Sequence, residues 1–72
     1  MYVFEISNTE IILDERHGCY RITVDASNRK NFSVELQDAN GFFNPIAWDD
    51  IPELTQWAVV RCADGTIHKY AE

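Results

Sequence analysis

Hydrophobic and polar residues alternate along most of the first half of the chain, and this period of two is typical of strands that bury one face. The alternation predicts strands over residues 1–7, 19–25 and 32–37. Residues 10–16 fit a strand or a helix by composition, but their adjacent isoleucines and the turn that follows them favour a strand. We therefore predict four strands here, with 10–16 and 19–25 forming a hairpin and a polar turn over 26–31.

Two glycine-containing dipeptides predict tight turns further along the chain. Asn40-Gly41 lies between apolar runs and predicts a two-residue type I′ hairpin, because both central residues of that turn need positive φ. The return strand is expected over 42–48, and Pro45 restricts it to a sheet edge because proline lacks the N–H. Asp64-Gly65 predicts a second two-residue hairpin, with the last strand over 66–70.

A single short helix is expected near residues 50–57. Asp50 and Glu53 have the spacing of a capping box, in which the first residue caps the helix N-terminus. The following stretch is rich in β-branched residues, so the helix is predicted to end after about two turns. Leu54 and Trp57 are expected to pack this helix onto the sheet.

Together these elements predict one compact domain over residues 1–72 of the α+β class, mainly β. We expect a small antiparallel sheet or barrel of five to seven short strands with one short α-helix near 50–57, and a barrel is the leading variant. A chain of 72 residues builds only a modest core, so self-association, for example as a homodimer, would add stability.

The charge balance limits the choice of partner. Twelve acidic residues against six basic ones give a formal net charge of −6, which opposes binding to nucleic acid or to an anionic membrane and favours a protein with a basic surface. The adjacent pair Arg29-Lys30 is expected to be solvated in a turn. Charged residues interrupt every apolar run before it could span a membrane, and Glu5 precedes any signal-peptide core, so the chain is expected to be cytoplasmic.

The residues that could bind a metal or supply a nucleophile are scattered. His17, Cys19, Cys62 and His68 lack the Cys-x₂-Cys spacing of common zinc sites. The hairpin predicted at Asp64-Gly65 would also direct Cys62 and His68 to opposite faces of the sheet. In a reducing compartment both cysteines are expected to be free thiols. We therefore expect no metal, no cofactor and no enzymatic activity, and a small Cys/His metal-binding or thiol protein is an alternative.

Carboxylates and aromatic rings cluster in the second half of the chain. Tryptophan is frequent at protein interfaces, and acidic groups attract basic surfaces. Carboxylates two apart on a strand lie about 6.8 Å apart, roughly twice the axial rise per phosphate of one DNA strand, so a row of them can imitate a nucleic-acid backbone. Acids at a helix start are expected from capping and dipole complementarity alone, and an ordinary solvated acidic surface is the alternative to mimicry. The candidate partner-binding residues are Trp48, Asp49, Asp50, Glu53, Asp14 and Glu10, of which the last two share one face of a strand.

These features predict a small acidic protein-interaction domain. Its most concrete form is an inhibitor encoded by a phage or mobile element, of the nucleic-acid-mimic or anti-CRISPR type, that blocks a basic nucleic-acid-binding host protein. A self-assembling accessory module is the alternative if the edge strand near Pro45 or the last strand carries a self-association surface.

Overall fold

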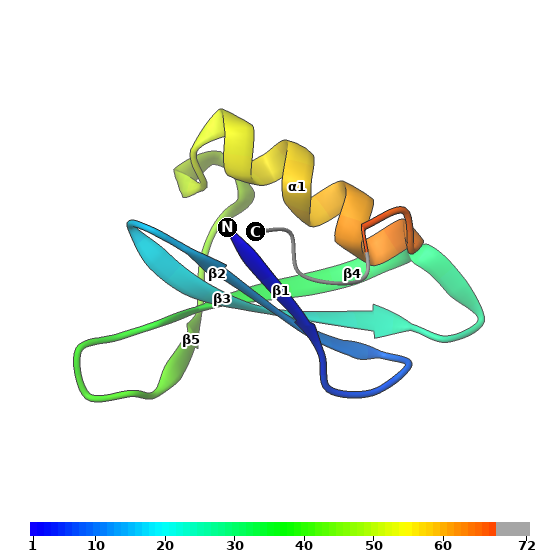
Figure 1. Ribbon diagram of the computed structural model, residues 1–72, viewed down its shortest axis with the longest axis horizontal. Helices are drawn as coiled ribbons and strands as arrows, with labels where there is room; N and C mark the ends of the chain where they lie inside the picture. Colours follow the sequence, from blue (N-terminus) through cyan, green and yellow to red (C-terminus); the bar gives the residue numbers. More distant parts are fainter. Residues whose placement is uncertain (68–72) are drawn as a thin grey trace.

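A five-stranded antiparallel sheet and one α-helix make up the computed structural model, which describes residues 1–67. The strands follow one another in the order β1-β2-β3-β4-β5, and the helix α1 lies across one face of the sheet (Figure 1). The fold is therefore α+β and mainly β, as predicted. The elements are β1 (Tyr2–Glu5), β2 (Glu10–Glu15), β3 (Gly18–Asp25), β4 (Asn28–Gln37), β5 (Phe43–Pro45), the 3₁₀ helix η1 (Trp48–Asp50) and α1 (Glu53–Asp64).

The first four strands confirm the alternation in the sequence. β2 and β3 form the predicted hairpin, with Glu15 opposite Gly18 across a two-residue turn. The turn between β3 and β4 is shorter than predicted, because β4 already begins at Asn28. The prediction that Arg29-Lys30 lies in a solvated turn is therefore wrong, since both residues belong to β4. Asp25 closes the short turn by accepting hydrogen bonds from the N–H and hydroxyl of Ser27.

The connection between β4 and β5 is longer than the predicted two-residue turn. Residues 38–42 form the loop, in which Gly41 has the expected positive φ of 90°. The Asp38 carboxylate organises this loop by accepting hydrogen bonds from the N–H groups of Asn40 and Phe42. β5 ends at Pro45 and lies at the sheet edge, so the edge position is confirmed but the strand is shorter than 42–48.

The helix starts later than the capping-box pattern predicted. Asp50 belongs to η1, and the residue before α1 is Pro52, which provides no side-chain cap. The prediction of a capping box is therefore wrong. Pro52 has no N–H to donate and fixes its own φ, so it suits the boundary between the extended chain and the first helical turn.

The helix also continues past residue 57, to Asp64. Gly65 then adopts the left-handed conformation, with φ of 89°, and its N–H donates to the carbonyls of Arg61 and Cys62. A left-handed glycine is a common helix stop, since it has no Cβ to clash. The Asp64-Gly65 hairpin prediction is wrong, because this dipeptide ends a helix. Of the strand predicted over 66–70, Thr66 and Ile67 are not in a strand, and the rest lies outside the described residues.

The core lies between α1 and the inner face of the sheet. The helix presents small side chains at a spacing of i, i+3, i+4, i+7 and i+8, which keeps them on one side of the helix. Small residues let α1 approach the strands closely. The buried helix residues are Thr55, Ala58, Val59, Cys62 and Ala63, and the buried strand residues are Val3, Ile11, Leu13, Tyr20, Ile22 and Val24.

Two further expectations are corrected by this packing. Leu54 and Trp57 do not pack the helix onto the sheet, because their side chains are 84% and 53% exposed. The sheet does not close into a barrel, since β1 and β5 stay at opposite ends of the strand order (Figure 1). No helix within residues 1–67 is long and apolar enough to cross a membrane.

Candidate protein-binding surface

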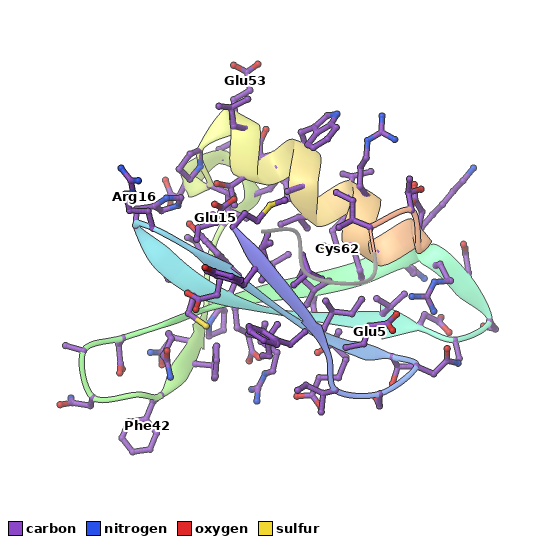
Figure 2. All side chains as sticks on the ribbon, in the orientation of Figure 1. Glu5, Glu15, Arg16, Phe42, Glu53 and Cys62 are labelled. Atoms are coloured by element: carbon purple, nitrogen blue, oxygen red, sulfur yellow. The ribbon has the colours of Figure 1, made fainter. Side chains whose placement is uncertain are left out.

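An open groove of about 520 Å³ runs along the outward side of α1. Figure 2 shows Glu53 projecting from the start of this helix away from the sheet. The helix forms one wall of the groove along nearly its whole length, and Trp48 of η1 lies across from it. We call this surface the α1 groove; its lining residues are Trp48, Glu53, Gln56, Trp57, Val60, Arg61 and Asp64.

A stripe of four residues runs along the wall of the groove that α1 forms. Glu53, Trp57, Val60 and Asp64 follow the spacing i, i+4, i+7 and i+11, which places them on one side of a helix. The two middle residues are apolar and exposed. The two end residues are acidic and exposed. The groove therefore has an apolar centre with a negative charge at each end.

Trp48 forms the opposite wall and is held in place from two sides. Its ring packs edge-to-face against Phe32 of β4, with ring centroids 5.9 Å apart. The Gln56 amide donates a hydrogen bond of 2.8 Å to the Trp48 carbonyl. Trp48 is still 40% exposed and lines the groove.

Charged side chains around the groove are mostly acidic. Asp49 and Asp50 of η1 are both exposed and lie directly after Trp48. The Arg61 guanidinium lies 4.8 Å from the centre of the Trp57 ring, in a cation–π contact. Hydrogen bonds from the Thr66 side chain and N–H lower the pKa of Asp64, and the nearby guanidinium groups of Arg61 and Arg29 lower it further.

The six candidate residues from the sequence divide between two surfaces. Trp48 and Glu53 line the α1 groove, whereas Asp49 and Asp50 follow Trp48 in η1, are exposed and are not part of the lining. Glu10 and Asp14 share one face of β2, as predicted, and alternate with its buried residues, so they lie on the sheet face that α1 does not cover.

The uncovered sheet face has its own charge pairing. Arg21 of β3 donates a hydrogen bond of 2.7 Å to Glu35 and lies 3.8 Å from a carboxylate oxygen of Glu10. The Arg21 guanidinium also lies 4.7 Å from the centre of the Phe43 ring. The charge of Glu10 is thus partly neutralised, which weakens it as part of a phosphate-like row.

Sequence reasoning missed the far part of the groove. Trp57 was assigned to the core, and Val60 and Asp64 were assigned to a strand and a turn. The signal that could have revealed them is the run of small residues on the buried side of α1. Once this run is recognised as the buried face, Leu54, Trp57 and Val60 must lie on the opposite face.

The cysteines lie on opposite sides of the sheet. Cys62 is buried between α1 and the sheet, and burial raises the pKa of its thiol to about 11. Cys19 lies on the outward face of β3, and burial and the nearby Asp14 raise its pKa as well. The His17 Nε2 is hydrogen-bonded to the Tyr20 hydroxyl at 2.9 Å.

Among the described residues, the histidine and the two cysteines do not form a set of metal ligands. Within residues 1–67, no group of three or more His, Cys, Asp or Glu side chains is arranged to hold a metal. The hairpin argument that separated Cys62 from His68 is wrong, because Cys62 lies in α1. His68 lies outside the described residues.

The α1 groove and its charges are the features from which function has to be inferred. No protein-family model, curated protein or solved structure matches this chain.

Proposed function

We propose that this chain is a small acidic protein-interaction domain that uses the α1 groove to bind a basic surface on another protein. The observation that carries the proposal is the orientation of α1. The helix packs small residues such as Ala58 and Ala63 against the sheet, while Leu54 and Trp57 face solvent.

The outward position of these large side chains leaves apolar area that a partner could bury. Burying a large apolar side chain contributes about 1.5–3 kcal/mol, and α1 leaves this contribution unused for Leu54 and for much of Trp57. Exposed tryptophans next to other apolar groups are typical of protein-binding surfaces, where they often dominate the binding energy. The groove between Trp48 and Trp57 provides a concave site for a partner side chain.

The acidic charges of this surface favour a partner with a basic surface. The groove lining contains the carboxylates of Glu53 and Asp64 and the guanidinium of Arg61, and the exposed Asp49 and Asp50 follow Trp48 in η1. The whole chain carries a net charge of −6. Such a surface attracts basic groups, accelerates association with a basic protein and repels nucleic acid.

The most concrete form of this function is an inhibitor of the phage or mobile-element type, including the anti-CRISPR type. It would occupy the nucleic-acid-binding surface of a host protein, because that surface is basic and already accommodates negative charge together with aromatic rings. The carboxylates would take the place of phosphates, and Trp48 and Trp57 would take the place of bases. This activity is binding alone and requires no catalytic group.

Affinity capture from the native host with paired variants tests the proposal. The unmodified chain should capture a protein with a basic patch, and free nucleic acid should displace that protein. Charge reversal by Asp49→Lys, Asp50→Lys and Glu53→Lys should abolish capture at low salt, and the difference from the unmodified chain should shrink as salt rises. Glu5→Lys with Asp14→Lys changes charges outside the groove and should leave capture intact. Capture that survives the triple reversal at all salt concentrations would contradict the proposal.

The uncovered sheet face favours a second candidate function, which is self-association. Tyr2 and Phe4 lie stacked on this face with ring centroids 6.4 Å apart, and both are about half exposed. The register places Ile12 between Phe4 and Arg21, whose charge is already paired. A second copy could cover this neutralised apolar strip with little charge repulsion. Sedimentation velocity should then show a dimer that Phe4→Lys dissociates.

A further inference from the structure

The walls of the α1 groove define what kind of chain segment can fill it. The stripe on its α1 wall spans from Glu53 to Asp64, which corresponds to about 16 Å along the helix axis, or three turns. The spacing i, i+4, i+7, i+11 is that of the seam along which two helices pack side by side. The groove is thus long enough for three turns of a second helix.

Side chains, and not free backbone groups, line this groove. Between its two ends the backbone of α1 is hydrogen-bonded within the helix, and the Trp48 carbonyl already accepts a hydrogen bond from Gln56. An extended segment gains affinity by pairing its N–H and C=O groups with a strand edge, which this groove does not offer. A helical segment satisfies its own backbone, so it can cover the groove without leaving buried polar groups unpaired.

The charges at the two ends of the stripe oppose a second copy of this chain as the occupant, and Arg61 is the one basic residue of the lining that each copy would bring. In a parallel pair of stripes, Glu53 would face Glu53 of the other copy, and Asp64 would face Asp64. In an antiparallel pair, Glu53 would face Asp64 at both ends. Like charges would therefore meet in either orientation, and such contacts oppose association. A segment with basic residues at both ends has no such conflict.

We infer that the α1 groove binds an amphipathic helix of a partner protein, whose contacting stripe has the order basic, apolar, apolar, basic at i, i+4, i+7 and i+11. The two apolar side chains pack against Trp57 and Val60 and face Trp48. The basic residues at the ends of the stripe pair with Glu53 and Asp64. The spacing of this stripe reads the same in both directions, but Arg61 and Arg29 lie near the Asp64 end, so the two acidic ends differ in their surroundings. This inference rests on the proposed function and specifies its partner.

Synthetic helical peptides test the inference directly. The probe is a peptide of about 18 residues that carries Arg, Leu, Leu and Arg at the stripe positions on an alanine and glutamine background. A second peptide has Glu in place of both Arg residues, and a third has a proline between the two Leu residues. The chain's two tryptophans, Trp48 and Trp57, both line the groove, so tryptophan emission reports occupancy of the groove itself.

The basic helical peptide should shift tryptophan emission to shorter wavelength and bind at least about tenfold more tightly than the acidic peptide at low salt. In the variant Glu53→Lys with Asp64→Lys, the order of the two affinities should reverse. Glu5→Lys with Asp14→Lys makes the same change in net charge and should keep the original order. Circular dichroism establishes that both variants are folded, and the comparison of peptides on the unmodified chain does not depend on them.

Each contrary outcome has a distinct meaning. If the proline peptide binds as tightly as the helical one, the groove takes a basic segment but not as a helix, so this inference fails and the proposed function stands. If the acidic peptide binds as tightly as the basic one, the charge argument fails and both are overturned. If no peptide shifts the emission, the helix inference fails, and the capture experiment alone decides the proposed function.

Discussion

Arg29 Nε donates a hydrogen bond of 2.8 Å to the carbonyl of Ala63, near the C-terminal end of α1. The same guanidinium donates through Nη1 to the carbonyl of Asn8, at 3.0 Å. Carbonyls in the last turn of a helix lack partners within the helix, and a cation also interacts favourably with this end. Arg29 therefore links β4, the β1–β2 connection and the end of the helix that carries the groove.

Removing this link should destabilise the fold. Arg29→Ala should lower the free energy of unfolding by about 1–2 kcal/mol, because it removes two charge-assisted hydrogen bonds and takes the partner from the carbonyl of the buried Ala63, whereas the carbonyl of the exposed Asn8 can accept from water. Arg29→Lys should restore only part of the loss, since an ammonium cannot reach both carbonyls in the same planar geometry. Urea unfolding measures the effect. Lys30→Ala, at the exposed neighbouring residue, is the matched control and should change stability little.

The two sides of α1 should respond oppositely to substitution. Val59→Ala removes buried volume and should cost about 2 kcal/mol of unfolding free energy. Leu54→Gln changes an outward residue and should change stability by no more than about 0.5 kcal/mol. Trp57→Gln should also leave most of the stability in place while it weakens binding of the basic peptide. Loss of folding in Leu54→Gln would show that this side of the helix is packed and would contradict the structure.

Gly65 should be sensitive to substitution because of its backbone conformation alone. A Cβ at this position would have no atom within 4 Å, so no steric contact opposes alanine. The φ of 89° is nevertheless unfavourable for a residue with a side chain, and Gly65→Ala should cost about 1 kcal/mol. Gly65→Asn should cost less, because asparagine tolerates the left-handed region better. Thermal unfolding of the two variants measures the difference.

The two cysteines should differ in reactivity. The thiolate is the reactive form, and Cys62 is fully buried with a pKa of about 11. At pH 8, a thiol reagent should therefore modify Cys19 first and reach Cys62 only when the chain is unfolded. Mass spectrometry of the singly modified protein identifies the site. Equal rates at both positions in the folded protein would contradict the burial of Cys62.

The Cys62 thiol makes the free energy of unfolding depend on pH. Its ordinary pKa is 9.0 and its folded pKa is about 11, so the unfolded chain releases the proton first as pH rises. The contribution to stability is thus complete below pH 9 and is lost as pH rises towards 11. Burial also raises the pKa of Tyr20, which adds to the decline at high pH. Urea midpoints across this range should fall less steeply in Cys62→Ala than in the unmodified chain.

The sequence by itself determined the sheet. Alternation predicted β3 and most of β4, because a strand with one buried face has a period of two, while the adjacent isoleucines and the turn after residue 16 predicted β2 and its hairpin with β3. Pro45 likewise indicated a sheet edge, since its missing N–H is a local property. The net charge and the cluster of Trp48 with three carboxylates are also visible without a structure. These features depend on neighbouring residues and need no knowledge of distant contacts.

Only the tertiary structure determined where the helix ends and which of its sides is buried, and therefore which residues line the groove. Val59 and Val60 have a local preference for a strand, but burial of Val59 with Ala58 and Cys62 against the sheet stabilises a helix through Asp64. The dipeptide Asp64-Gly65 is compatible with a hairpin turn and with a helix end. Because the helix continues to Asp64, Gly65 ends it. The size of Trp57 suggested a core position, yet the sheet accommodates the small side of α1. The binding surface follows from that choice, because packing the small residues inward leaves the large ones outside.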